Sequence, residues 1–212
     1  MRSLLLHRAA KPLVWLLCLL PFARLAWGAF SGGLGANPAE FLLRATGDWT
    51  LRLLCITLAL TPLRVLTRTP ALARFRRMLG LWTYFYAGLH LLCYAGFDMS
   101  LDPSQIARDI AKRPFILVGF CAFVLLTLLA ATSLQRAIRL LGARRWQALH
   151  RLVYLIACLG LLHFFWMRAG KHNLAEVKVY AAVVAALLGW RVWFNLRRTR
   201  SAVGRPASRA AE

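Results

Sequence analysis

Six long apolar segments, separated by short arginine-rich or polar connections, constrain this chain more than any other feature. Only helices and closed barrels satisfy every backbone hydrogen bond inside a bilayer, and a run of about 20 apolar residues predicts a spanning α-helix. The sequence is 60% hydrophobic with a mean hydropathy of +0.57, which excludes a soluble domain. We therefore predict an all-α polytopic membrane protein, a six-helix transmembrane bundle. The expected spans are about 12–30, 48–66, 78–97, 115–133, 146–167 and 177–196.

The net charge of +21, from 28 Lys and Arg against 7 Asp and Glu, would point to nucleic acid in a soluble protein. Here most basic residues lie between or just beyond the apolar segments, where they set topology and contact anionic membrane lipid. No nucleic-acid role is expected. The basic residues concentrate at the N-terminus, in the second and fourth connections and in the tail, which predicts that both termini are cytoplasmic. Residues 198–212 are expected to form a disordered cytoplasmic tail.

The first segment has an alternative interpretation. A basic start, a short apolar core and Ala-Trp-Gly-Ala before Phe30 resemble a secretory signal cleaved near Ala29. We favour a retained first helix.

Three histidines fall inside predicted spans: His90 in the third, and His150 and His163 in the fifth. An imidazole in hydrocarbon needs a partner, which is another side chain, a carbonyl, a proton or a metal. His150 and His163 are thirteen positions apart, roughly 20 Å along a helix, so they lie at two depths. The predicted orientation places His90 and His163 at one depth in the outer half. Because no CxxCH motif is present, they predict a non-covalent, six-coordinate, low-spin haem b.

His150 lacks a matching histidine on the third span, where the chain has Arg76 and Arg77. Arginine cannot bind iron, but it pairs well with a haem propionate or a flavin phosphate. This inner position is therefore left with three options: a singly ligated haem, a haem completed by another residue, or a flavin. On an ideal helix His150 and His163 are about 140° apart, so either a bulge rotates one of them or they serve two sites.

Two stretches carry a family resemblance: RFRRMLGLWTYFYAGLHLLCY around His90, and RRWQALHRLVYLIACLGLLHFFW around His150 and His163. They resemble the ferric-reductase-like transmembrane superfamily and, within it, the MsrQ (YedZ) family of haem-binding subunits of the periplasmic methionine-sulfoxide reductase system. In the wider superfamily the third span has a further histidine, which is missing here at Arg76 and Arg77.

The resemblance implies a bacterial inner-membrane subunit that transfers electrons and is not itself the catalytic subunit. It implies haem b, one or two copies, and FMN as cofactors. It also implies electrons drawn from the quinone pool and passed to a periplasmic molybdopterin-containing methionine-sulfoxide reductase. By position, His90, His150 and His163 match the haem ligands of the family.

Two other functions use the same histidines. A proton-coupled transporter would use them as a relay, but no Asp or Glu occurs within the third to fifth predicted spans. A non-redox membrane scaffold would use them structurally.

Overall fold

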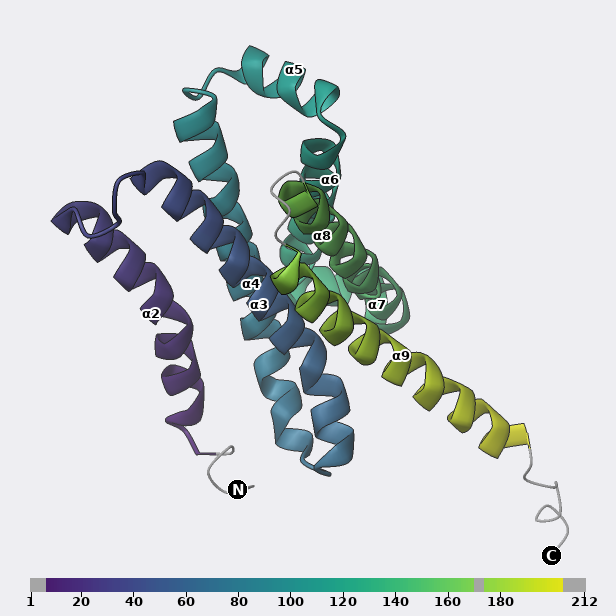
Figure 1. Cartoon of the computed structure of the whole chain (residues 1–212). Helices are drawn as coiled ribbons and strands as arrows, with labels where there is room; N and C mark the ends of the chain where they lie inside the picture. The colour runs from purple at the N-terminus through teal and green to yellow at the C-terminus, as the bar shows by residue number, and fades with distance from the viewer. Residues whose placement is uncertain (1–6, 170–173, 204–212) are drawn as a thin grey trace, which may run out of the picture.

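The computed structural model describes residues 7–169 and 174–203, which are helical apart from short connections (Figure 1). In chain order the helices are α2 Ala10–Ser31, α3 Pro38–Leu66, the 3₁₀ helix η1 Pro70–Phe75, α4 Arg76–Cys93, the π-helix η2 Tyr94–Asp98, α5 Pro103–Lys112, α6 Pro114–Ala131, α7 Gln135–His150, α8 Leu152–Ala169 and α9 Ala175–Val203. The all-α prediction is confirmed. Helix α9 continues into the predicted tail as far as Val203, and 204–212 lie outside the described residues.

Five stretches are long and apolar enough to cross a membrane: Ala10–Ser31, Pro38–Leu66, Pro114–Ala131, Gln135–Ala169 and Ala175–Thr199. The chain is therefore a multi-pass membrane protein. Helix α4, expected as the third of six spans, is not among them, because its 18 residues begin with Arg76 and Arg77 and also contain His90, which lower its mean hydropathy. It nevertheless lies in the middle of the bundle, packed most extensively against α3 (Figure 1). A six-span topology remains a prediction.

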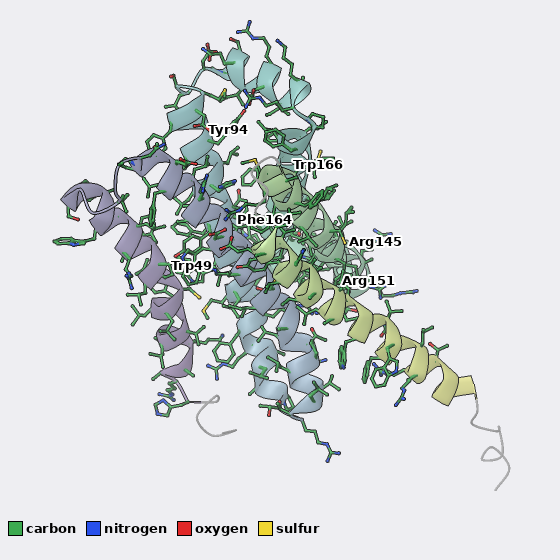
Figure 2. The ribbon with its side chains drawn as sticks, viewed as in Figure 1. Trp49, Tyr94, Arg145, Arg151, Phe164 and Trp166 are labelled. Atoms are coloured by element: carbon green, nitrogen blue, oxygen red, sulfur yellow. The ribbon has the colours of Figure 1, made fainter. Side chains whose placement is uncertain are left out.

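The core consists of two clusters of buried side chains. One joins α3, α4, α6, α8 and α9 through residues such as Leu58, Leu126 and Ile156. The other joins α2 to α3 and α4, and Trp49 packs against it where α2 and α3 lie side by side (Figure 2). Many apolar side chains on the outer helix faces are exposed, as lipid contact requires, among them Leu13, Leu16, Leu20, Val124, Leu128, Val179 and Val183.

A single hydroxyl fixes α2 to α4. Tyr86 is fully buried, and its hydroxyl accepts a hydrogen bond from the Phe22 N–H at 2.9 Å and donates one to the Cys18 carbonyl at 2.8 Å. Phe22 and Cys18 are one helical turn apart, next to Pro21. The phenol therefore ties α4 to both ends of this turn of α2.

The helix that carries His150 and His163 is interrupted at Arg151. There the Arg151 N–H donates to the Ala148 carbonyl at 3.1 Å, and α8 begins at Leu152. A second irregularity in α7 lies at Gly142, with φ 72° and ψ 157°. His150 thus ends α7 whereas His163 belongs to α8, so the two imidazoles do not share one regular helix.

The connection between the third and fourth predicted spans contains the helix α5, which lies across one end of the bundle (Figure 1). Asp102 caps it by accepting hydrogen bonds from the Ser104 and Gln105 N–H groups at 2.8 and 3.3 Å. Hydrogen bonds from the side chains of Ser104 and Gln105, together with those from their N–H groups, hold the pKa of the Asp102 carboxyl below its ordinary value. Asp109 anchors the helix by accepting from the Tyr94 hydroxyl at 2.8 Å and pairing with Arg113 at 2.9 Å.

Candidate functional site

The structure brings His90 of α4 and His163 of α8 together inside the bundle. Their ring centroids are 6.2 Å apart and their planes are 78° from parallel. The two residues are far apart in sequence, so only the packing of α4 and α8 around α3 and α6 makes them neighbours. This is the pair that the sequence places at one depth.

Each imidazole of this pair is held by a backbone carbonyl of another helix. The Nδ1 atom of His90 lies 2.9 Å from the carbonyl oxygen of Leu43 in α3, and that of His163 lies 2.7 Å from the carbonyl oxygen of Phe115 in α6. A carbonyl oxygen can only accept, so each neutral ring carries its proton on Nδ1. Both Nε2 atoms are left with a lone pair, as a metal ligand requires.

Two glycines make room for these rings. A Cβ atom on Gly47 would lie 3.1 Å from the Cε1 and Nδ1 atoms of His90, and one on Gly119 would lie 2.7 Å from Nδ1 of His163. Gly47 follows Leu43 by four residues and Gly119 follows Phe115 by four, which is one helical turn in both cases. Each ligand candidate therefore occupies the same kind of seat, formed by a carbonyl and the glycine one turn later.

Sequence reasoning missed both seats. The available signal was a glycine inside a long apolar segment, which often marks a close approach of two elements. It does not reveal which side chain approaches.

The spacing of the pair fits a haem. Two nitrogens about 2 Å from one iron, each about 1 Å in front of its own ring centre, place the centroids about 6 Å apart. Within the described ranges no group of three or more His, Cys, Asp or Glu side chains could hold a bare metal ion. A haem supplies four nitrogens of its own and needs only two from the protein, so the pair suits it better than a free ion.

His150 lies in a different environment, at the other end of the bundle. Its Nε2 atom is 3.3 Å from the Thr132 hydroxyl, and its ring stacks on Trp146 with centroids 4.1 Å apart. Trp146 in turn donates from Nε1 to the Thr132 carbonyl at 2.9 Å. The positive charge of Arg76 acts on His150. Arg77, the next residue on the first turn of α4, is exposed. No second imidazole of the described residues joins His150.

The chain matches the family model "Ferric reductase like transmembrane component" over residues 46–161. It is also 70% identical over 204 residues to the "Protein-methionine-sulfoxide reductase heme-binding subunit MsrQ" of Polaromonas naphthalenivorans, covering 96% of this chain and 93% of the relative. The chain belongs to the MsrQ family. Its fold is the ferric-reductase-like transmembrane fold, as the sequence predicts.

More distant relatives carry the same name. The MsrQ protein of Ralstonia nicotianae is 58% identical over 193 residues, covering 91% of this chain and 89% of the relative. That of Caulobacter vibrioides is 47% identical over 189 residues, covering 89% of each. No solved structure matches the chain.

Proposed function

We propose that this protein is a haem b-containing electron-transfer subunit of a protein-methionine-sulfoxide reductase, with His90 and His163 as the axial ligands of the haem. The observation that carries the proposal is the facing imidazole pair, 6.2 Å between centroids, with both Nδ1 atoms bound to carbonyls. The relatives are named as heme-binding subunits of that reductase, which supports the proposal.

Neighbouring residues set the protonation and the orientation of both imidazoles. The carbonyls of Leu43 and Phe115 keep the proton on Nδ1, fix the ring orientation and make each Nε2 atom a better donor. Gly47 and Gly119 let the rings approach α3 and α6 closely enough for these hydrogen bonds to form. A low-spin, six-coordinate haem b held there would supply a one-electron carrier.

The donor and acceptor belong to the same proposal. The donor is a reduced quinone from the bacterial inner membrane, and the acceptor is a periplasmic molybdopterin-containing methionine-sulfoxide reductase that repairs oxidised proteins. Because basic residues collect at the ends of α3, α6 and α9, both termini would be cytoplasmic. His90 and His163 would then lie in the periplasmic half, near the acceptor.

The environment of His150 suits a second group. We place FMN there, with Arg76 and Arg77 pairing with its phosphate; a second haem ligated by His150 alone is the alternative. The proximity of Arg76 to His150 and the stacking of Trp146 on its ring support an aromatic, anionic occupant.

The experiment compares His90→Ala and His163→Ala with His150→Ala as the matched control. Haem content, the low-spin spectrum and released flavin are measured on each purified full chain. Electron transfer is then followed as haem reduction by a quinol analogue and reoxidation by the partner reductase with methionine sulfoxide. Each of the first two variants should lose the low-spin spectrum while His150→Ala keeps it. An intact low-spin spectrum in His90→Ala or His163→Ala would refute the axial pair, and a haem that quinol cannot reduce would refute the donor.

A further inference from the structure

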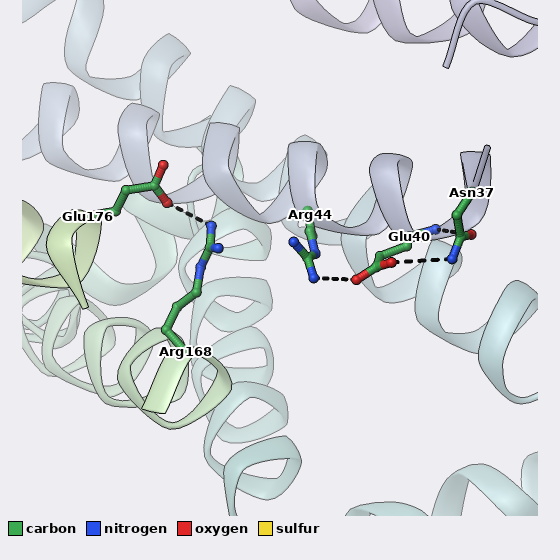
Figure 3. A network of polar contacts seen from close by, with 5 residues as sticks. All are labelled: Asn37, Glu40, Arg44, Arg168 and Glu176. Atoms are coloured by element: carbon green, nitrogen blue, oxygen red, sulfur yellow. Dashed lines mark hydrogen bonds and ion pairs between the residues drawn. The ribbon is translucent and has the colours of Figure 1, made fainter. Parts of the chain in front are cut away.

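The charges of this protein are segregated between the two ends of the bundle. All described carboxylates lie towards the end formed by the start of α3, the η2 and α5 region and the start of α9; they are Glu40, Asp48, Asp98, Asp102, Asp109 and Glu176. Four of them pair with arginines there: Glu176 with Arg168 at 2.7 Å and Glu40 with Arg44 (Figure 3), and also Asp48 with Arg52 and Asp109 with Arg113. The opposite end, which we call the arginine end, contains the end of α3, α7 and the second half of α9, and has no described carboxylate.

A buried arginine lies towards the arginine end. Arg191 follows Val177 and Val184 at seven-residue spacing along the bundle-facing side of α9, and its exposed fraction is only 7%. Its Nη2 atom donates to the Leu58 carbonyl of α3 at 2.6 Å. That carbonyl has no helical donor four residues later, because Pro62 lacks an N–H. Arg191 thus replaces the hydrogen bond that the proline removes.

The charge of Arg191 is nevertheless not balanced. Its other partners are also uncharged: the Leu187 carbonyl, 3.3 Å from Nη1, and the ring of Tyr154, whose centroid is 5.0 Å from Cζ. Its Nε atom is buried without a hydrogen-bond partner. The nearby guanidinium of Arg76 repels it. A buried cation without a counter-ion is strongly unfavourable, so an anion is expected close by.

Tyr154 also lines a cavity of about 560 Å³. Its lining comes from α9, the Arg151 turn and α8: Arg151, Tyr154, Asn195, Arg198 and Thr199. Arg151 projects where α7 meets α8 (Figure 2). Asn195 and Arg198 follow Arg191 by one and two turns on the same face of α9. Tyr154 connects the two sites, because its ring lies against the Arg191 guanidinium and the same residue lines the cavity.

We propose that this cavity binds a phosphate group, and that Arg191 supplies part of the positive potential behind it. The lining offers two guanidinium groups, an amide, a hydroxyl and a phenol, and no carboxylate. Paired guanidinium forks match the oxygens of a tetrahedral oxyanion. The cavity is larger than a phosphate, so it suits a phosphate attached to a larger molecule. The source is either the headgroup of an anionic phospholipid or a water-soluble phosphate ester. The site does not depend on haem ligation by His90 and His163.

The test uses the full-length protein, delipidated in detergent, with two probes. Phosphatidylglycerol binding is measured by native mass spectrometry. Inorganic phosphate is compared with chloride at equal ionic strength through the thermal unfolding midpoint. The variants are Arg151→Gln and Arg198→Gln, and the matched control is Arg139→Gln, an exposed arginine on α7 outside the cavity. Folding is checked by helical circular dichroism and gel filtration, so the result is independent of haem content.

Wild type and Arg139→Gln should bind one anionic group, and each cavity variant should bind at least about tenfold more weakly, since each removes a charge-assisted contact. Tyr154→Phe, which removes only the hydroxyl, should weaken binding a few-fold. Lipid binding that inorganic phosphate cannot displace identifies a headgroup as the source; stabilisation by phosphate alone identifies a soluble ester. Binding of neither probe, or an equal loss in Arg139→Gln, would overturn the proposal.

Discussion

Replacing Gly119 by alanine is the sharpest perturbation of the proposed ligand pair. The added Cβ atom would lie 2.7 Å from Nδ1 and 2.9 Å from Cε1 of His163, well inside ordinary contact distance. To reach about 3.5 Å the imidazole must retreat by roughly 1 Å from α6. That movement is towards breaking the 2.7 Å hydrogen bond between Nδ1 and the Phe115 carbonyl.

The expected effect is on haem binding and not on the helix. Loss of a buried hydrogen bond costs about 1–3 kcal/mol, and loss of a hydrogen bond that orients a metal ligand lowers metal affinity about 10–100-fold. Alanine is intrinsically better than glycine inside a helix by about 0.5–1 kcal/mol, so propensity alone would stabilise the variant. Haem affinity should therefore fall at least tenfold even though α6 itself is not weakened.

The assay is haem retention per chain together with the electron paramagnetic resonance spectrum of the ferric protein. Gly160→Ala is the matched control, because Gly160 lies on α8 one turn before His163 and a Cβ atom added there would have no neighbour within 4 Å. The control should keep wild-type haem content and spectrum. If Gly119→Ala retains haem as well as Gly160→Ala does, with an unchanged spectrum, the seat proposed for His163 is wrong.

Three further outcomes follow from the geometry. Gly47→Ala should weaken haem binding less than Gly119→Ala, because its Cβ atom would lie 3.1 Å from the ring it meets; equal or larger loss would contradict this ranking. Arg191→Met removes an unfavourable buried charge but leaves the Leu58 carbonyl unpaired, which costs about 1–3 kcal/mol, so Pro62→Ala, which restores an N–H, should raise the unfolding free energy more in Arg191→Met than in wild type; a double-mutant cycle in detergent without this coupling would speak against the bond. Asp102→Ala should speed amide hydrogen exchange in the first turn of α5. Because hydrogen bonds lower the pKa of the Asp102 carboxyl in the folded protein, wild type should lose the same protection only as the pH falls below the ordinary carboxyl pKa of about 4. Exchange that is insensitive to both the substitution and the pH would argue against the cap.

The sequence was sufficient to predict the helical membrane fold and the histidine pair. Arginine distribution orients the helices, and orientation converts the positions of His90 and His163 into similar depths. For the same reason, the sequence indicated that His150 has Arg76, and not a second histidine, at its depth. Depth along a helix follows from residue number, so such inferences need no tertiary structure.

Features that depend on contacts between helices could not be predicted from the sequence. Gly47 and Gly119 matter only because another helix brings an imidazole to each. The Leu58 carbonyl, left without a helical donor by Pro62, receives a hydrogen bond from Arg191 only because α9 packs against α3 there. The interruption between α7 and α8 at Arg151 involves no proline or glycine, so the sequence did not indicate it.

Helix α5, in contrast, could have been recognised. Asp102 followed by Pro103 is a typical helix start, with a capping carboxylate and a proline at the first helical position. The mixed charges of the connection concealed this local signal.

The most direct measurement is the optical spectrum of the purified full-length protein, oxidised and dithionite-reduced, combined with a pyridine haemochrome assay. The imidazole pair of His90 and His163 predicts a low-spin b-type spectrum with non-covalently bound haem. A protein that shows no haem absorbance, although it was expressed with ample haem and is correctly folded, would contradict the proposed electron-transfer function.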